Sequence, residues 1–169
     1  MAISLYDFSV PSLIRGLTNM SAILDKAVAH AAAKKIDSAT VGQLRLFPDM
    51  HPLSRQVQIA CDTAKGAAGR LAGVEIPKHE DTETTLPELK ARIAKTIEFL
   101  KSIKPEQMAG DDVRPIEIKF PNGSWKFTAK SYVIDFVLPN FYFHDSMVYA
   151  LLRKGGLEIG KGDFLGAIA

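Results

Sequence analysis

Four long segments of this sequence carry apolar side chains at intervals of three and four residues, and this period restricts the fold more than any other feature. Such intervals place the apolar residues on one face of a helix, whereas a strand would need strict alternation. The segments cover about 9–35, 50–72, 86–103 and 128–153. In the first, the apolar face consists of Leu13, Ile14, Leu17, Met20, Leu24, Ala27, Val28 and Ala31. The pattern predicts four helices, each with one buried face.

Residues that cap or end a helix stand at several ends of these segments. Ser9 can cap the first helix and Asp49 the second, because their side-chain oxygens accept free backbone N–H groups. Gly73 stands where a left-handed residue would end the second helix. Thr85 and Glu88 have the spacing of a capping box, which predicts the start of the third helix.

Between residues 105 and 128 the period changes from helical to alternating, which is typical of strands. The alternating residues are Ile116, Ile118, Phe120, Trp125 and Phe127. Asn122 and Gly123 lie between the two runs, and such a pair supplies the positive φ angles of a tight hairpin turn. A two-stranded hairpin is marginally stable alone, so Trp125 and Phe127 are expected to anchor it against the helices.

These elements predict an all-α fold, a four-helix bundle with a small β-hairpin between its third and fourth helices. The chain has 169 residues, 47% of them hydrophobic, so residues 1–169 are expected to form a single domain. Pro139 predicts a kink or break of the fourth helix near 136–138. The alternative is an irregular α-domain with a β-appendage. The long stretch 103–128 would permit a crossover between helices.

Composition and charge argue against several classes of function. The formal net charge is +2 and the basic residues are scattered, so no nucleic-acid partner is expected. No apolar stretch reaches the roughly 18 residues of a membrane span, and the first ten residues lack the pattern of a signal peptide. Cys61 is the only cysteine, which excludes an intrachain disulfide. We expect a cytoplasmic protein with no membrane partner.

His144 and Asn140 are the polar pair that most suggests a site, because residues four apart share one face of a helix. A neutral imidazole is a good metal ligand, and a carboxamide oxygen suits harder cations. His51, near the start of the second helix, is a third metal candidate, and Gln56 is a candidate for binding a polar ligand. The cofactor would then be a divalent Zn, Ni, Fe or Mn ion. The alternative is that His144 is a core histidine bonded to a carbonyl or to Asn140.

An aromatic cluster lies on the fourth helical segment: Phe136, Phe141, Tyr142, Phe143 and Tyr149. Because these rings span several faces of one helix, some of them must lie off the core face. They line an apolar pocket or form a dimer interface, and both interpretations stay open. Tyr142 therefore joins Gln56, Asn140 and His144 as a candidate for binding a small molecule. Cys61 stands among alanines, which favours a small core residue over a nucleophile.

Several motifs resemble a bacterial family of unknown function within the DinB-like superfamily of metalloenzymes. They are residues 138–144 (LPNFYFH), 149–153 (YALLR), 160–166 (GKGDFLG), 56–62 (QVQIACD) and 70–73 (RLAG), which together extend over most of the chain. The resemblance implies a four-helix bundle and a homodimer. It also implies a divalent metal held by three histidines, one on the second helix and a His-x-x-x-His pair on the fourth. Several members use this metal to activate a small thiol for transfer or isomerisation.

The sequence departs from that ligand pattern on both helices. The pair on the fourth helix is Asn140-x-x-x-His144, and residues 56–62 of the second helix contain no histidine. His51 is the nearest, a turn or more too early. Two functions therefore stay open. One is a DinB-like protein with a degenerate or altered metal or small-ligand site between the second and fourth helices. The other is a non-enzymatic, dimeric small-molecule-binding or stress-associated scaffold.

Overall fold

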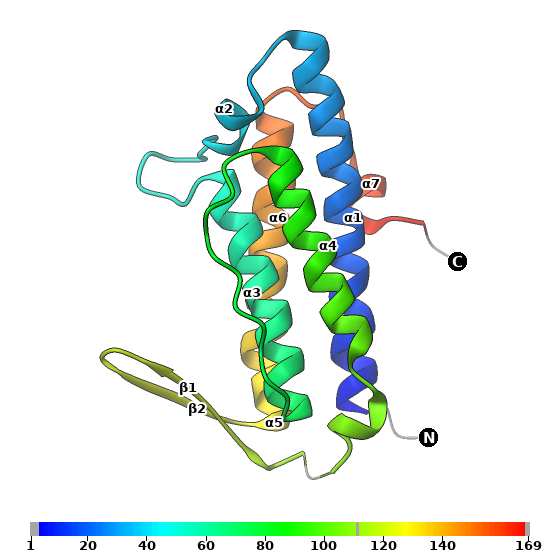
Figure 1. Ribbon diagram of the computed structural model, residues 1–169, viewed down its shortest axis with the longest axis vertical. Helices are drawn as coiled ribbons and strands as arrows, with labels where there is room; N and C mark the ends of the chain where they lie inside the picture. The colour runs from blue at the N-terminus through cyan, green and yellow to red at the C-terminus, as the bar shows by residue number, and fades with distance from the viewer. Residues whose placement is uncertain (1–3, 111, 168–169) are drawn as a thin grey trace.

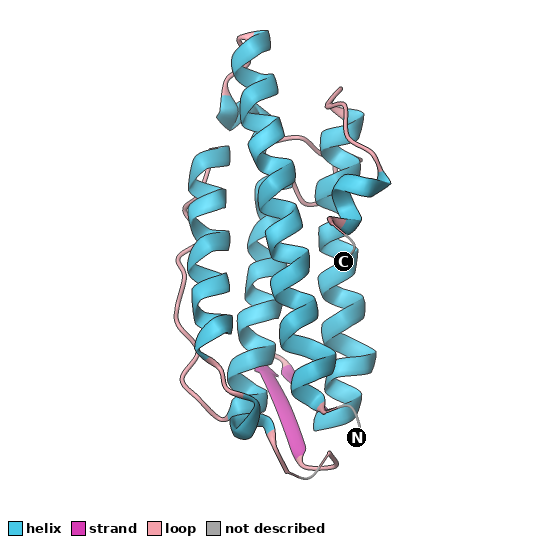
Figure 2. Cartoon of the chain, turned by 90° about the vertical axis from the view of Figure 1, so that its right-hand side faces the viewer, coloured by secondary structure: helices cyan, strands magenta, loops and turns pink. Residues whose placement is uncertain are grey.

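Four long helices run side by side in the computed structural model, which describes residues 4–110 and 112–167 (Figure 1, Figure 2). They are α1 (Leu5–Lys34), α3 (Leu53–Ala72), α4 (Leu86–Ser102) and α6 (Leu138–Lys154). Each packs chiefly against two others in the cyclic order α1, α4, α3, α6, and their buried faces form one core. The predicted four-helix bundle is confirmed. Within the described ranges, no helix has both the length and the apolar character to cross a membrane.

The connector between α3 and α4 runs the length of the bundle. In Figure 1 the chain leaves α3 at the lower end and climbs back along it to the upper end, where α4 begins. Figure 2 shows the same loop along one side of the bundle. The helices α3 and α4 therefore run in the same direction. The stretch 103–128, which would have permitted a crossover, instead stays at the lower end and holds η1 (Pro105–Met108) and the hairpin.

Two of the predicted helix ends are confirmed. Glu88 donates its backbone N–H to the Thr85 hydroxyl, and the Glu88 carboxylate accepts the backbone N–H of Thr85, which makes the capping box at the start of α4. Gly73 follows α3 with a φ of 66°, the left-handed conformation that ends a helix. Both ends depend on chemistry between near neighbours in the sequence.

The predicted caps of α1 and α3 are wrong. The helix α1 begins earlier than predicted, after Ser4, which forms a capping box with Asp7. Ser9 is fully buried inside the helix, and its hydroxyl donates to the carbonyl of Leu5 at 2.6 Å. Asp49 lies in the loop that separates α3 from the short α2 (Ser38–Gly42). The helix α3 follows Pro52 and has no side-chain cap.

The predicted hairpin is present as strands β1 (Pro115–Phe120) and β2 (Gly123–Thr128), paired antiparallel. Phe120 pairs with Gly123, so Pro121 and Asn122 form the turn, one position before the pair that the sequence suggested. Phe127 packs against the helical region as predicted, with its ring 5.7 Å from that of Phe136. The Trp125 ring is half exposed but also meets the Phe136 ring, edge to face at a centroid distance of 5.5 Å, so both predicted anchors are confirmed.

The expected break of the fourth helix takes the form of a π-helix. The short helix α5 (Ala129–Ser131) continues into η2 (Tyr132–Val137), and α6 begins directly afterwards. Pro139 stands in the first turn of α6, where its missing N–H is tolerated. The wider turn of a π-helix accommodates the backbone ahead of this proline. The remaining element, α7 (Lys161–Leu165), lies beside α1 (Figure 1).

Candidate functional site

His144 on α6 and Gln56 on α3 meet in the interior between the two helices. Their side chains are 8% and 2% exposed, and the His144 Nδ1 atom lies 2.6 Å from the Gln56 Oε1 atom. The Gln56 Nε2 atom donates a second hydrogen bond, of 3.2 Å, to the backbone carbonyl of His51. Two hydrogen bonds in series therefore fix the orientation of the imidazole ring.

These hydrogen bonds also assign the tautomer of His144. The Gln56 amide nitrogen already donates to the His51 carbonyl, so the amide oxygen is the atom that faces the ring. An amide oxygen only accepts, and Nδ1 therefore carries the hydrogen. The other ring nitrogen, Nε2, keeps its lone pair and has no hydrogen-bond partner in the part of the chain that the structure describes. One nitrogen of a well-oriented ring is thus available to a ligand.

The imidazole of His144 is uncharged at neutral pH. Burial lowers the pKa of His144 from 6.5 to about 4, and the positive charges of His51 and Arg55 contribute in the same direction. A group with this pKa holds a proton poorly near pH 7, so it is a weak general base there. The ring is better suited to accept a hydrogen bond, or to offer its lone pair, than to carry a proton between reactants.

Asn140 and His51 lie near this pair but make other contacts. The Asn140 Nδ2 atom donates to the Thr63 hydroxyl at 2.8 Å, one helical turn from His144 on the same side of α6. His51 precedes α3 and its side chain is exposed, and its carbonyl, rather than its ring, contacts Gln56. The predicted residues Gln56 and His144 are therefore in contact, and Asn140 lies one turn away with a partner of its own.

The aromatic cluster divides between the core and the surface. Tyr142 turns toward α1, where its hydroxyl lies 2.6 Å from the Ser12 hydroxyl, so it does not share a side of α6 with His144. Phe141 is fully buried in the core. Phe143 is 55% exposed, and its ring meets the His144 ring edge to face at a centroid distance of 5.2 Å. Of these aromatic residues, Phe143 is therefore the one that flanks the imidazole.

A metal held by three side chains of this chain does not fit the site. Between residues 4 and 167, position 111 aside, no three His, Cys, Asp or Glu side chains come together in a way that could hold a metal ion. Burial raises the pKa of the Cys61 thiol to about 12, so this residue stays protonated and supplies no thiolate. The donors near His144 are amides and hydroxyls, which are weak ligands for transition metals.

A buried cluster of charges on the other side of α3 was not predicted. Arg92 on α4 has a side chain that is only 1% exposed and forms ion pairs with Asp62, Asp81 and Glu83 at 2.7, 3.0 and 3.1 Å. The Arg92 guanidinium also donates to the Glu80 carbonyl at 3.0 Å. Three of these four partners belong to the connector that runs along α3. Arg92 therefore holds the connector between α3 and α4 against the bundle. The sequence signal that could have indicated this role is the position of a charged residue on the buried face of α4.

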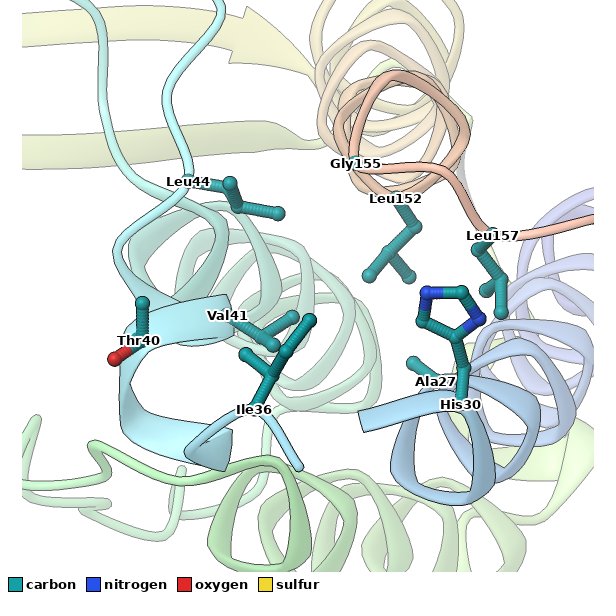
Figure 3. A pocket seen from close by; sticks show the side chains of 9 residues that line it. All are labelled: Ala27, His30, Ile36, Thr40, Val41, Leu44, Leu152, Gly155 and Leu157. Carbon is teal, nitrogen blue, oxygen red and sulfur yellow. The ribbon is translucent and has the colours of Figure 1, made fainter. Parts of the chain in front are cut away.

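A separate apolar cavity of about 210 Å³ lies at the upper end of the bundle (Figure 3). Its walls come from the end of α1, from α2 and from the end of α6, and most of its side chains are aliphatic. Figure 3 shows the His30 ring at one wall and Thr40 at another. Neither Gln56 nor Phe143, which contact the His144 ring, borders this cavity. The two regions are therefore distinct, and His30 borders this cavity rather than the site at His144.

The fold is a four-helix bundle of the DinB type. A crystal structure described as a DinB family member protein from Shewanella denitrificans superposes with a TM-score of 0.89, at 42% sequence identity over 97% of this chain and 93% of that chain. Residues 5–165 match the family described as Domain of unknown function (DUF1993), and the chain belongs to this family. A comparison with curated proteins finds no significant match. The resemblance inferred from the motifs is confirmed.

Proposed function

We propose that this protein binds a small polar molecule between α3 and α6 through the Nε2 atom of His144, in a site altered from that of metal-binding relatives. The observation that carries the proposal is the 2.6 Å contact between His144 and Gln56, which leaves one ring nitrogen available. The ligand has an O–H, N–H or S–H group that donates to this nitrogen. A thiol is the donor that the family resemblance favours.

The environment of His144 favours binding over acid–base chemistry. Metal-binding histidines are usually oriented by an acceptor at the second nitrogen, and Gln56 supplies such an acceptor here. The ring thus keeps the orientation of a ligand, although the additional imidazoles of a three-histidine site are missing. With a pKa of about 4, the ring accepts hydrogen bonds at neutral pH without being protonated.

Nuclear magnetic resonance of protein labelled with 15N-histidine tests this proposal. At pH 7 the His144 ring should be the neutral tautomer with hydrogen on Nδ1. Addition of 2-mercaptoethanol should shift the Nε2 resonance saturably in the wild type and in Asn140→Ala, but not in Gln56→Leu. A hydrogen on Nε2, or the absence of a saturable shift, would overturn the proposal. Stoichiometric binding of added zinc chloride at micromolar concentration would show instead that an intact metal site is present.

We also propose that two copies of the chain associate. Phe143 is 55% exposed beside His144, and Tyr142 is 36% exposed on the side of α6 that faces α1, so α6 presents aromatic surface on two faces. Light scattering should return the mass of a dimer at micromolar concentration, and Phe143→Gln should shift the equilibrium toward the monomer. A monomeric wild type at the same concentration would contradict this proposal.

A further inference from the structure

Asp145 is a buried carboxylate without a partner. Its exposure is 3%, yet it has no hydrogen bond and no ion pair with any of the described residues. It follows His144 directly on α6 but turns toward α1, where its Oδ2 atom lies 3.6 Å from the position that a Cβ atom on Gly16 would occupy. Native proteins rarely bury a carboxylate that nothing contacts, so this residue requires an explanation.

A cavity of about 120 Å³ adjoins the carboxylate between α1, α6 and α7. Its lining includes Arg15, Gly16, Asn19, Tyr142, Asp145 and Phe164. Gly16 lets α6 pack closely on α1 beside the cavity, because a Cβ atom there would lie 2.5 Å from the Phe141 ring. The cavity therefore has a carboxylate in its wall, two aromatic rings and space for a few heavy atoms.

Two polar side chains in the wall of this cavity, Arg15 and Asn19, donate to backbone carbonyls at the C-terminal end of the described chain. Arg15 donates to the backbone carbonyls of Leu165 and Ala167, at 2.9 and 3.1 Å. The Asn19 amide nitrogen donates to the carbonyl of Phe164 at 3.0 Å. These contacts fasten α7 and Ala167 to α1. Among the described residues, Asp145 is left as an acceptor without a donor, and a bound molecule would supply one.

We propose that this cavity binds a small organic ammonium ion, with Asp145 as its anionic anchor. An ammonium group supplies both the hydrogen-bond donors and the positive charge that the buried carboxylate lacks. The rings of Tyr142 and Phe164 suit the same ligand, because an aromatic face attracts a cation. The volume restricts the ligand to an ion about the size of methylammonium or ethylammonium. This site is separate from His144, which faces α3.

Amide resonances of the 15N-labelled protein at pH 8 provide the test, with methylammonium chloride titrated at constant ionic strength. The shifts of residues that line the cavity should saturate with a dissociation constant of about 1–10 mM. Asp145→Asn keeps the shape and removes the charge, and it should weaken binding at least about tenfold. Asp25→Asn is the matched control, because it removes an exposed carboxylate from α1 and should leave binding unchanged.

A second measurement uses the wild type alone and does not depend on the folding of any variant. Methanol has the size of methylammonium but no charge, so it should cause no saturable shift in the same residues. Equal binding of methanol and methylammonium would overturn the proposal. So would shifts that stay linear up to about 100 mM methylammonium, or an unchanged affinity in Asp145→Asn.

Discussion

Two buried polar side chains that face α3, Arg92 and His144, have side-chain partners, whereas the buried carboxylate of Asp145, which faces α1, has none among the described residues. Arg92 lies among three carboxylates, and His144 is held by Gln56. Asp145, the residue after His144, faces a small cavity and contacts no donor in the described chain. Arg92, His144 and Asp145 are all nearly inaccessible to solvent, so the extent of burial does not distinguish them.

The difference separates two consequences of burying a polar group. A buried charge with partners on several segments holds those segments together, because losing one partner leaves the others uncompensated. A buried polar group that lacks a hydrogen-bond or ion-pair partner keeps a lone pair or a charge available to a bound molecule. Arg92 belongs to the first kind and Asp145 to the second. His144 combines them, with one nitrogen bound and one free.

The largest effect is expected at Arg92. Replacing it in Arg92→Met leaves Glu83 without a cation and Asp62 with Lys65 alone, and the free energy of unfolding should fall by about 4 kcal/mol. Urea unfolding at pH 7, followed by circular dichroism, measures this change. Lys90→Met breaks an ion pair with Asp25 that is more exposed, and it should cost less than about 1 kcal/mol. Equal losses in the two variants would mean that Arg92 does not hold the connector.

Much of the fold was predictable from the sequence where the chemistry is local. The capping box of Thr85 with Glu88 and the left-handed Gly73 depend only on near neighbours, and both are confirmed. Ser9 was assigned as a cap because a serine before an apolar stripe is typical of one. The real cap is Ser4, since Ser9 is itself buried in the helix. Burial is a tertiary property, and the local pattern does not contain it.

The site was less predictable because it depends on how α3 is set against its neighbours. His144 and Gln56 were both candidates, but the hydrogen bond between them follows from the packing of α3 on α6. The Thr63 partner of Asn140 was missed for the same reason. Arg92 was missed because a long charged side chain usually lies at the surface. Its partners Asp81 and Glu83 belong to the connector between α3 and α4, whose path along the bundle is a tertiary feature.

The second prediction concerns Asp145, whose burial should make the free energy of unfolding depend on pH. Burial raises its pKa from 3.8 to about 7, so between these values the folded state holds a proton that the unfolded state has lost. Stability from this residue is therefore complete below pH 3.8 and is lost as the pH rises through 7. At pH 8, Asp145→Asn should be more stable than the wild type by about 3 kcal/mol, and the two should converge below pH 4. A difference in urea unfolding that does not vary with pH would contradict a buried, unpartnered carboxylate.

His144 should give the opposite slope with a smaller amplitude. Its pKa is lowered from 6.5 to about 4, so between these values the unfolded state binds a proton that the folded state does not. The contribution is complete above pH 6.5 and is lost as the pH falls through 4, by about 2 kcal/mol. His144→Asn should lack this decline in urea unfolding, and His30→Asn should keep it. If both variants keep it, the ring of His144 is not held neutral by burial.

The smallest effect concerns the hydrogen bond between Asn140 and Thr63, which decides whether the Asn140 side chain is occupied. In a double-mutant cycle, Asn140→Ala and Thr63→Val should couple by about 1 kcal/mol in the free energy of unfolding. Asn140→Ala with Thr96→Val is the matched control, because Thr96 bonds the Arg92 carbonyl on α4 and should show no coupling. A cycle without coupling would leave Asn140 free to act with His144. Measured coupling would mean instead that a ligand at His144 must displace Thr63 before the Asn140 amide nitrogen can contact it.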